Sequence, residues 1–334
     1  MSRPTLQSLA AELSLSRQTI SNALNRPEVV RPDTLERVLA AIESSGYRPS
    51  ALGKALRSQR SHTIGLRLRP VVDGINGAVL DRFLHALTEA AQAHGYRVTL
   101  FTADTLEEEI DRFEDLYRVS SIDACALIET FVDDPRPELL AKIGIPTVAF
   151  GRPWGSTTST HHWVDIDGLA GTRAAATWFR ESGHTRIGYL GWPAGSGLGD
   201  DRRAGWRAAC HDLPGADDLD LSFEDGMAEG FAGAGTLLAR GATAVVCGSD
   251  SLAIGAMSEF RIAFPEAHPL PVVGYDDTPV AAALGLSSVH QPVEEAAQHC
   301  VRVLMSLLAG EPDAQPRELL LTPTLVKRAF TPML

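Results

Sequence analysis

Three short stretches within the first 46 residues carry apolar side chains at the spacing of an α-helix. The positions that we expect to face inward are Leu6, Leu9, Ala10 and Leu13, then Leu15, Thr19, Ile20 and Leu24, and finally Leu35, Val38, Leu39 and Ile42. Ser16 is placed to cap the second helix, Pro32 lies in the first turn of the third, and Gly46 follows its end. Because only a few residues separate the first two helices, the pattern predicts a helix-turn-helix.

From residue 63 the pattern changes to short apolar strands that alternate with helices. Segments such as "TIGLRL", "YRVTLFT", "ACALIE" and "PTVAFG" are typical of buried strands, and the alternation starts again after "HHWVDIDG" with a helix expected over residues 171–182. Alternation over two stretches of about 100 residues predicts two doubly wound parallel-sheet domains. Ligands of such sheets bind beyond the carboxyl ends of the strands, so two facing domains predict a cleft.

One helix of this second part has a strongly divided surface. Its apolar stripe consists of Leu106, Ile110, Phe113 and Tyr117. Five acidic residues between positions 107 and 114 form the opposite face. We interpret this acidic face as solvated surface without a function of its own.

Length and composition restrict the class of protein. With 334 residues the chain is too long for one ordinary core, and 44% hydrophobic with 22% charged residues is typical of soluble globular proteins. No apolar run approaches 18 residues and the N-terminus is polar, so we expect neither a membrane span nor a secretory signal, and a cytoplasmic location. The four cysteines are scattered without a CxxC pair, which favours buried reduced thiols over disulfides or a zinc site.

The formal net charge of −12 is unevenly distributed along the chain. Residues 1–60 hold nine basic and five acidic residues, a balance of +4, whereas residues 61–334 hold 21 and 37, a balance of −16. A basic head on an acidic body suits a chain whose head meets phosphate. On the second helix of this head, the expected exposed residues are Arg17, Gln18, Ser21 and Asn22. Arg can pair bidentately with guanine, and Gln or Asn with adenine, although a solvated polar face is the alternative interpretation.

The segments "SLAAELSLSRQTISNALN" and "TLERVLAAIESSGYRPS" resemble the head of the lactose-repressor (LacI/GalR) family of transcription regulators. The resemblance implies that the two residues after the helix-opening Ser16, Arg17 and Gln18, read the major groove of DNA. Two positions depart from the family pattern. Asn22 stands where Arg is common, and Ser14 stands in the turn where Gly is usual.

Residues 49–60 resemble the hinge helix of the same family. Ser50 replaces the usual Asn, and Gly53 stands where Ala is common, which lowers helix stability by roughly 0.5–1 kcal/mol. Leu56 matches the leucine that similar proteins insert into the minor groove. A small apolar contact within a linker is the alternative role for Leu56.

Later segments extend the resemblance from Thr5 to Arg328, among them "VVCGSDSLAIGA", "VVGYDD" and "TPTLVKR". They imply the periplasmic sugar-binding fold, in which the chain crosses between subdomains three times, here near residues 163, 290 and 323. We therefore expect an all-α helix-turn-helix head at 1–48, a hinge at 49–60 and an α/β body at 61–334. The body would consist of two doubly wound parallel-sheet subdomains, one about 61–163 and 291–323, the other about 164–290 and 324–334.

The resemblance also implies that Arg202, Ser249, Asp250 and Asp276 bind an effector. Asp and Arg supply the fixed acceptors and donors that sugar hydroxyls need, and Trp192 is placed to stack on a sugar ring. Core packing is an equal alternative for Trp154 and Trp163, and the first loop of the body adds Arg69, Asp73 and Asn76 as candidates. The alternative role for Asp250 and Asp276 is the capping of a helix and the ordering of a loop.

No catalytic, cofactor or metal motif competes with this interpretation. The segment "GSGLGD" at 195–200 lacks the third glycine of a dinucleotide loop and is interpreted as a cleft loop; the pair His161-His162 has no partner at metal-ligand spacing. We therefore predict a repressor that binds a near-palindromic operator as a homodimer and responds to a small molecule, a sugar or glycoside. A sugar-binding protein of the same body fold and an enzyme with a doubly wound core are the alternatives.

Overall fold

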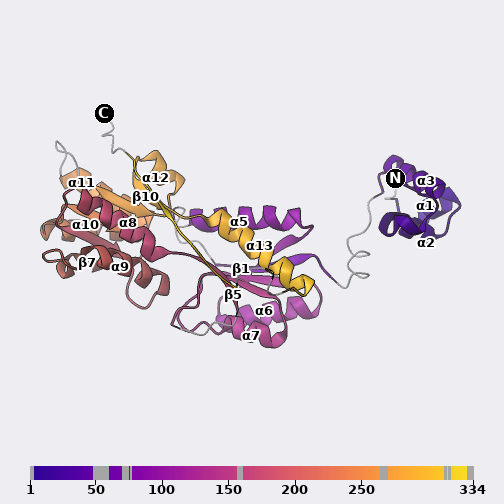
Figure 1. Ribbon diagram of the computed structural model, residues 1–334, viewed down its shortest axis with the longest axis horizontal. Helices are drawn as coiled ribbons and strands as arrows, with labels where there is room; N and C mark the ends of the chain where they lie inside the picture. The colour runs from indigo at the N-terminus through magenta and orange to yellow at the C-terminus, as the bar shows by residue number, and fades with distance from the viewer. Residues whose placement is uncertain are drawn as a thin grey trace. The chain divides into compact units, whose positions relative to one another are not determined.

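The computed structural model describes residues 4–47, 60–69, 75, 77–155, 161–263, 270–311, 314 and 317–328. Contacts within the chain divide it into two units, a head at residues 1–61 and a body at residues 62–334 (Figure 1). The hinge expected at 49–60 lies outside the described residues apart from Arg60. The same holds for Leu56, Asp73 and Asn76.

The described residues of the head form three α-helices and one short 3-10 turn. Its elements are α1 (Leu6–Leu13), α2 (Arg17–Asn25), the turn Pro27–Val29 and α3 (Pro32–Ser45). Ile20, Ala23 and Val38 are buried at its centre, so the predicted helix-turn-helix is confirmed. The inward position expected for Leu39 is wrong, because Leu39 is 49% exposed. Ala41, one turn from Val38 along the helix, is buried instead.

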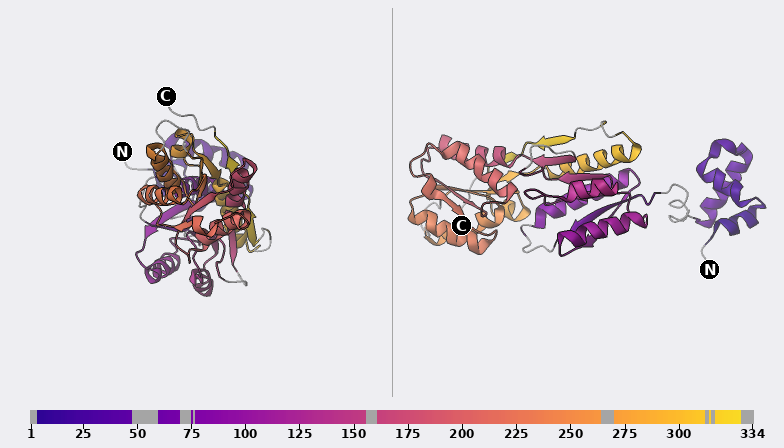
Figure 2. Two further views of the ribbon diagram at one scale, coloured as in Figure 1. Left: turned by 90° about the vertical axis from the view of Figure 1, so that its left-hand side faces the viewer. Right: turned by 90° about the horizontal axis from the view of Figure 1, so that it is seen from below.

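The body contains two six-stranded sheets, each covered by helices on both faces (Figure 2). The first sheet has the order β11-β5-β4-β3-β1-β2 and is parallel throughout. Its strands are β1 (Thr63–Leu68), β2 (Arg97–Thr102), β3 (Ala124–Leu127), β4 (Thr147–Phe150), β5 (His162–Ile166) and β11 (Glu318–Leu321). Helices α5 (Gly77–Ala93) and α13 (Val293–Ala309) pack on one face, and α6 (Leu106–Arg118) and α7 (Arg136–Ile143) on the other.

The second sheet has the order β12-β10-β9-β8-β6-β7, and its edge strand β12 is antiparallel to β10. Its strands are β6 (Ile187–Gly191), β7 (Asp220–Ser222), β8 (Ala244–Cys247), β9 (Val272–Tyr275), β10 (Ser287–His290) and β12 (Thr324–Val326). Helices α8 (Gly168–Glu181) and α9 (Gly197–Cys210) cover one face. Helices α10 (Met227–Ala239) and α11 (Asp250–Ala263), with the short α12 (Pro279–Ala283), cover the other.

Three crossings connect the two subdomains. β5 pairs with β4 and β11 as far as Ile166, so the first crossing follows Ile166 rather than lying near residue 163. Asp167 then caps α8 by accepting a hydrogen bond from the Ala170 N–H at 2.8 Å, which starts that helix before the expected residue 171. The second crossing follows His290, and the third follows Leu321.

The solvated role expected for the acidic face of α6 is wrong at one position. Glu109 is 1% exposed because it lies between two guanidinium groups. Its carboxylate oxygens are 3.1 Å from Arg67 Nη1 and 2.9 Å from Arg136 Nη1. Both arginines come from distant parts of the chain, so helical periodicity alone could not distinguish Glu109 from its solvated neighbours.

All four cysteines are buried and form no disulfide, as the sequence predicts. Across the described ranges, no helix is long and apolar enough to cross a membrane. In the same part of the chain, no group of three or more His, Cys, Asp or Glu side chains could hold a metal ion. His161 and His162 belong to no such group.

Candidate functional site

The first candidate site is the exposed face of α2 in the head. Ser16 precedes the helix in an extended conformation, and its hydroxyl accepts a hydrogen bond from the Thr19 N–H at 3.0 Å. Arg17 and Gln18 follow on the exposed surface, while Ser21 and Asn22 are half-buried. The Gln18 Nε2 atom donates to Asn22 Oδ1 at 2.9 Å, which fixes the orientation of both amides. The face therefore presents a guanidinium beside a pair of oriented amides.

The turn before α2 contains a residue with left-handed backbone geometry. Ser14 has φ +54° and ψ +40°, and its N–H donates to carbonyl groups at the end of α1. A side chain at such a position costs roughly 1–2 kcal/mol relative to glycine. Glycine adopts this geometry more readily than serine, because it has no Cβ atom.

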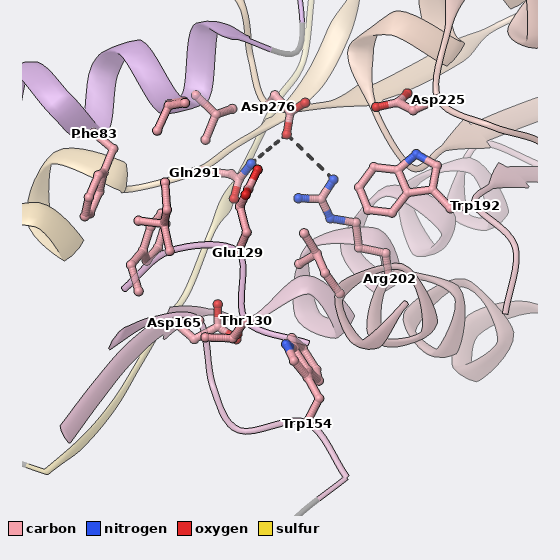
Figure 3. A pocket seen from close by; sticks show the side chains of 16 residues that line it. Phe83, Glu129, Thr130, Trp154, Asp165, Trp192, Arg202, Asp225, Asp276 and Gln291 are labelled. Carbon is pink, nitrogen blue, oxygen red and sulfur yellow. Dashed lines mark hydrogen bonds and ion pairs between the residues drawn. The ribbon is translucent and has the colours of Figure 1, made fainter. Parts of the chain in front are cut away.

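The second candidate site is a cavity of about 320 Å³ between the two subdomains of the body (Figure 3). Its lining residues come mostly from loops at the carboxyl ends of strands, the edge that the sequence pattern predicts. They are Val79, Leu80, Phe83, Ile128, Glu129, Thr130, Phe150, Gly151, Trp154, Asp165, Trp192, Leu198, Arg202, Asp225, Asp276 and Gln291. Among the residues predicted to bind an effector, Arg202, Asp276 and Trp192 are present in this set.

Arg202, Asp276 and Gln291 form the polar centre of the cavity (Figure 3). Gln291 Nε2 donates to Asp276 Oδ1 at 2.6 Å, and Arg202 Nη1 lies 3.7 Å from the same oxygen. The Arg202 guanidinium is only 3% exposed and packs 3.7 Å from the centre of the Tyr275 ring and 5.2 Å from that of Trp192. The polar groups are thus held in fixed positions before any ligand arrives.

The protonation of Asp276 is altered by this environment. Burial raises the pKa of Asp276 to about 8, although the Arg202 guanidinium opposes the change, and the charges of Asp250 and Asp225 add to it. At neutral pH the Asp276 carboxyl therefore retains its proton in most molecules and can donate a hydrogen bond as well as accept one.

Ser249 and Asp250 are completely buried and do not line the cavity. Asp250 Oδ1 accepts from the Ser288 hydroxyl at 2.6 Å, and its Oδ2 accepts from the Thr278 N–H at 2.7 Å. The Ser249 hydroxyl pairs with Asp225 Oδ1 at 2.5 Å. Both residues support the loops behind the cavity wall. Asp225, the partner of Ser249, lines the cavity itself.

Of the remaining aromatic and loop candidates, some line the cavity and others do not. Trp154 lines the cavity, with the Arg152 guanidinium 4.8 Å from its ring centre, whereas Trp163 packs in the core beneath α6 and α7. Arg69 is half-exposed and forms an ion pair with the lining residue Glu129 at 3.1 Å. The segment 195–200 is not a cleft loop throughout, because α9 begins at Gly197 with Ser196 as its cap.

Several lining residues were missed by sequence reasoning. Phe83 and Phe150 line the cavity but are not among the candidates that the sequence suggests, and Asp225 and Gln291 carry no motif. A signal existed for the last two, because each follows the end of a strand of the second sheet. Phe83 offered no such signal, since it lies in the middle of a helix.

Comparison with known proteins covers both the head and the body of the chain. Residues 5–50 match the family model "Bacterial regulatory proteins, lacI family", and residues 176–331 match "Periplasmic binding protein-like domain". The HTH-type transcriptional regulator CelR of Thermobifida fusca is 31% identical over 345 residues, covering 98% of each chain. The chain belongs to the lacI family.

Solved structures extend the likeness over the whole fold of this lacI-family chain. A structure described as a transcriptional regulator CelR–cellobiose complex matches 98% of the chain and 100% of its own length, with 28% identity and a TM-score of 0.71. The lac repressor dimer bound to operator and the anti-inducer ONPF matches 99% of both chains with a TM-score of 0.82, and its 23% identity supports the fold alone.

Membership of the family settles the general class of this protein. It is a helix-turn-helix, DNA-binding transcription regulator with an effector domain, and not an enzyme. The family resemblance and the fold class predicted from the sequence are therefore confirmed, with a helical head and two parallel α/β subdomains.

Proposed function

We propose that the chain represses transcription as a homodimer on a near-palindromic operator, and that a sugar or glycoside bound in the body cavity changes its affinity for that operator. The observation that supports this proposal is that one chain combines two polar groups. The first is the surface of α2 with Arg17, Gln18 and Asn22, and the second is the buried group of Arg202, Asp276 and Gln291.

The head supplies the groups that operator recognition requires. Arg17 can bind guanine in a bidentate manner, and the oriented amides of Gln18 and Asn22 can pair with adenine. Ser16 would hold the start of α2 against the DNA backbone, with Ser21 beside the bases. Two heads related by twofold symmetry would enter major-groove sites one helical turn apart, and Leu56 of each hinge would insert into the minor groove.

The body supplies groups suited to a polyhydroxylated ligand. Asp276 and Gln291 offer donors and acceptors to hydroxyl groups, while Trp192 and Trp154 offer faces for the C–H side of a sugar ring. The cellobiose named for the CelR structure supports a sugar ligand. Ser249 and Asp250 would act from behind the wall, and Arg69, Asp73 and Asn76 would complete the site from the first loop.

Control of DNA binding follows if the ligand has different affinities for two arrangements of the subdomains. The three crossings permit such a change, since the cavity walls come from both subdomains. The operator lies on the chromosome, so we place the protein in the cytoplasm. The mechanism requires no cofactor and no metal.

The test is selection of genomic fragments by the purified full chain at near-physiological salt, with and without pooled sugars. We expect one near-palindromic site whose occupancy changes with the sugars. Arg17→Ala should cost about 1–3 kcal/mol of discrimination at one base pair. The control Arg112→Ala removes an equally exposed charge on α6 of the body and should leave base preference unchanged. Unchanged preference with both Arg17→Ala and Gln18→Ala would contradict base recognition by α2.

A further inference from the structure

The loop after β4 reaches from the first subdomain to the second. Residues 151–155 belong to this loop, and within the first subdomain the backbone of Trp154 pairs with Val132 and accepts a hydrogen bond from the Asp133 N–H at 3.1 Å. The Trp154 ring, however, lies against Gly197, the first residue of α9 in the second subdomain. A Cβ atom at Gly197 would lie 2.2 Å from Trp154 Cγ and 2.3 Å from Trp154 Cδ2. Only glycine therefore permits this approach.

The helix itself gives no reason for glycine at this position. Gly197 belongs to the helical turn that begins α9, and alanine is a better helix former than glycine. The contact with the Trp154 ring is the feature that excludes a larger residue. Gly197 thus belongs to a close contact between the two subdomains.

A second contact between the subdomains comes from Arg152 in the same loop. Its Nε donates to Asp165 Oδ2 at 2.6 Å, and its Nη2 donates to the Ile166 carbonyl at 3.3 Å. The same Nη2 atom lies 3.3 Å from Asp201 Oδ2 on α9. Ile166 ends β5, immediately before the first crossing. One guanidinium group therefore joins the loop, the start of that crossing and the second subdomain.

The pair of Arg152 and Asp201 is well shielded from solvent. The two side chains are 20% and 12% exposed. Burial raises the pKa of Asp201, whereas the Arg152 guanidinium and a hydrogen bond from the Leu169 N–H, at 3.0 Å, oppose that change. Water and salt screen such a pair less than one on the open surface. Its attraction therefore favours the arrangement in which the loop lies against α9.

These contacts directly adjoin the cavity (Figure 3). Trp154 and Asp165 line it from the first subdomain, and Leu198 and Arg202 line it from α9. The Arg152 guanidinium lies 4.8 Å from the centre of the Trp154 ring. A ligand in the cavity would therefore touch both sides of the boundary that Arg152 and Trp154 bridge.

We propose that the loop and α9 form a clasp that holds the subdomains closed around the cavity and positions the Trp154 ring in its wall. The members of the clasp are Arg152, Trp154, Gly197 and Asp201. Its effect on ligand and operator affinity rests on the proposed function. A ligand that touches both walls prefers the closed arrangement and shifts the population toward it. Weakening the clasp lowers the closed fraction, so the apparent affinity for the ligand falls in proportion.

A cross-link tests the clasp without any ligand. A Cβ atom at Gly197 would lie 2.8 Å from Trp154 Cβ, and a disulfide needs about 3.5–4.5 Å between these atoms, so a small shift suffices. We expect the full chain with Trp154→Cys and Gly197→Cys to form this disulfide in most molecules under oxidised glutathione. Peptide mapping by mass spectrometry measures the cross-linked fraction. The four native cysteines are buried and should not compete.

The control for the cross-link combines Trp154→Cys with Ala208→Cys. Ala208 is exposed on α9 and lies about 16 Å further along the helix than Gly197, so this pair should not cross-link. Cross-linking that is absent or equal in the two pairs would overturn the clasp.

A substitution at Gly197 tests the function of the contact. Gly197→Ala places a methyl group where the Trp154 ring lies, so we expect it to weaken the binding of a probe sugar at least about tenfold. Isothermal titration of the full chain with glucose, galactose and cellobiose measures this change. The same alanine should have little further effect in the Trp154→Ala background, because the ring is no longer there. A loss that persists in that background would overturn the clasp, because alanine would then act within α9.

Two further variants separate the clasp from general effects of substitution. Gly235→Ala on α10 is the control, because its Cβ atom would meet the end of the flexible Glu259 side chain at 3.3 Å, and it should leave the affinity unchanged. Asp201→Asn keeps an oxygen for the Leu169 N–H but loses the attraction to Arg152, so the affinity should fall about threefold. Unchanged affinity in both Gly197→Ala and Asp201→Asn would overturn the proposal. Where none of these sugars binds the parent chain, the failure concerns the proposed ligand, and the cross-link decides whether the clasp exists.

Discussion

The surface of α2 in the head and the cavity of the body use similar polar side chains in opposite surroundings. Arg17 and Gln18 are exposed, and the contacts that order this face, from Ser16 to Thr19 and from Gln18 to Asn22, stay within one helical turn. Arg202 is almost completely buried, and its partner atoms belong to Gly248 and Asp276, far along the chain.

This difference has an energetic consequence. An exposed side chain on a helix can be replaced with little effect on folding, so the exposed face of α2 is free to vary. A buried charge must keep its partners, because desolvation without compensation costs several kcal/mol. We therefore expect substitutions of buried polar groups in the body to change stability and ligand binding together, and substitutions of the exposed side chains of α2 to leave stability nearly unchanged.

The largest expected effect concerns Glu109, which lies between Arg67 and Arg136. Glu109→Gln removes the shared counter-charge of two buried guanidinium groups and should lower the free energy of unfolding by about 3 kcal/mol. Urea denaturation of the full chain, followed by circular dichroism, measures this change. Glu107→Gln on the exposed side of the same helix is the matched control and should stay within about 0.5 kcal/mol. Equal effects of the two substitutions would contradict the role of burial.

The same residue shows where sequence reasoning succeeds and where it stops. Periodicity placed Phe113 and its neighbours on the buried stripe of α6, because that signal is local. Glu109 could not be separated from Glu107 in this way, since its burial depends on arginines contributed by β1 and α7. The order of strands and helices could be predicted because it depends on local patterns of apolar residues. The partners of Glu109 could not, because they come from distant parts of the chain.

The cavity follows the same rule. Arg202, Asp276 and Trp192 were found because each occupies a recognisable position in a motif or at the end of a strand. Phe83 was missed because a helical phenylalanine has no local feature that distinguishes a cavity wall from a core. Asp250 was expected to contact the ligand, but its burial behind Ser288 and Thr278 depends on how three loops pack.

The next effect is a pH dependence that should distinguish the body from the head. Burial raises the pKa of Asp276 to about 8, so the folded protein binds a proton there that the unfolded chain releases above pH 4. This contribution to stability is fully present below about pH 4 and is lost as the pH rises through about 8. In Asp276→Asn the free energy of unfolding should therefore decrease less steeply as the pH rises. The slope should differ from that of the parent chain by at most about 1.4 kcal/mol per pH unit.

Urea denaturation at pH 5, 6, 7 and 8 measures this slope. Asp217→Asn, an exposed acid of the same subdomain, is the control and should reproduce the slope of the parent chain. A parental slope in Asp276→Asn as well would show that Asp276 is ionised throughout this range, contrary to the effect expected from its burial.

The smallest effect belongs to the backbone of the head, where local geometry decides. Ser14 has φ +54° in the turn before α2, and Gly46 has φ +65° at the end of α3, with open space around its Cα. Left-handed geometry disfavours a side chain at both positions, but glycine loses more conformational freedom on folding, which offsets part of that cost. Ser14→Gly should therefore stabilise the head by about 0.5–1 kcal/mol, and Gly46→Ala should destabilise it by a similar amount. Hydrogen exchange of the α1 and α3 amides in the full chain measures both changes. Opposite signs are expected because Ser14→Gly removes a side chain from a left-handed position, whereas Gly46→Ala adds one. A loss of protection in Ser14→Gly would mean that the hydroxyl of Ser14, and not its backbone, governs the turn.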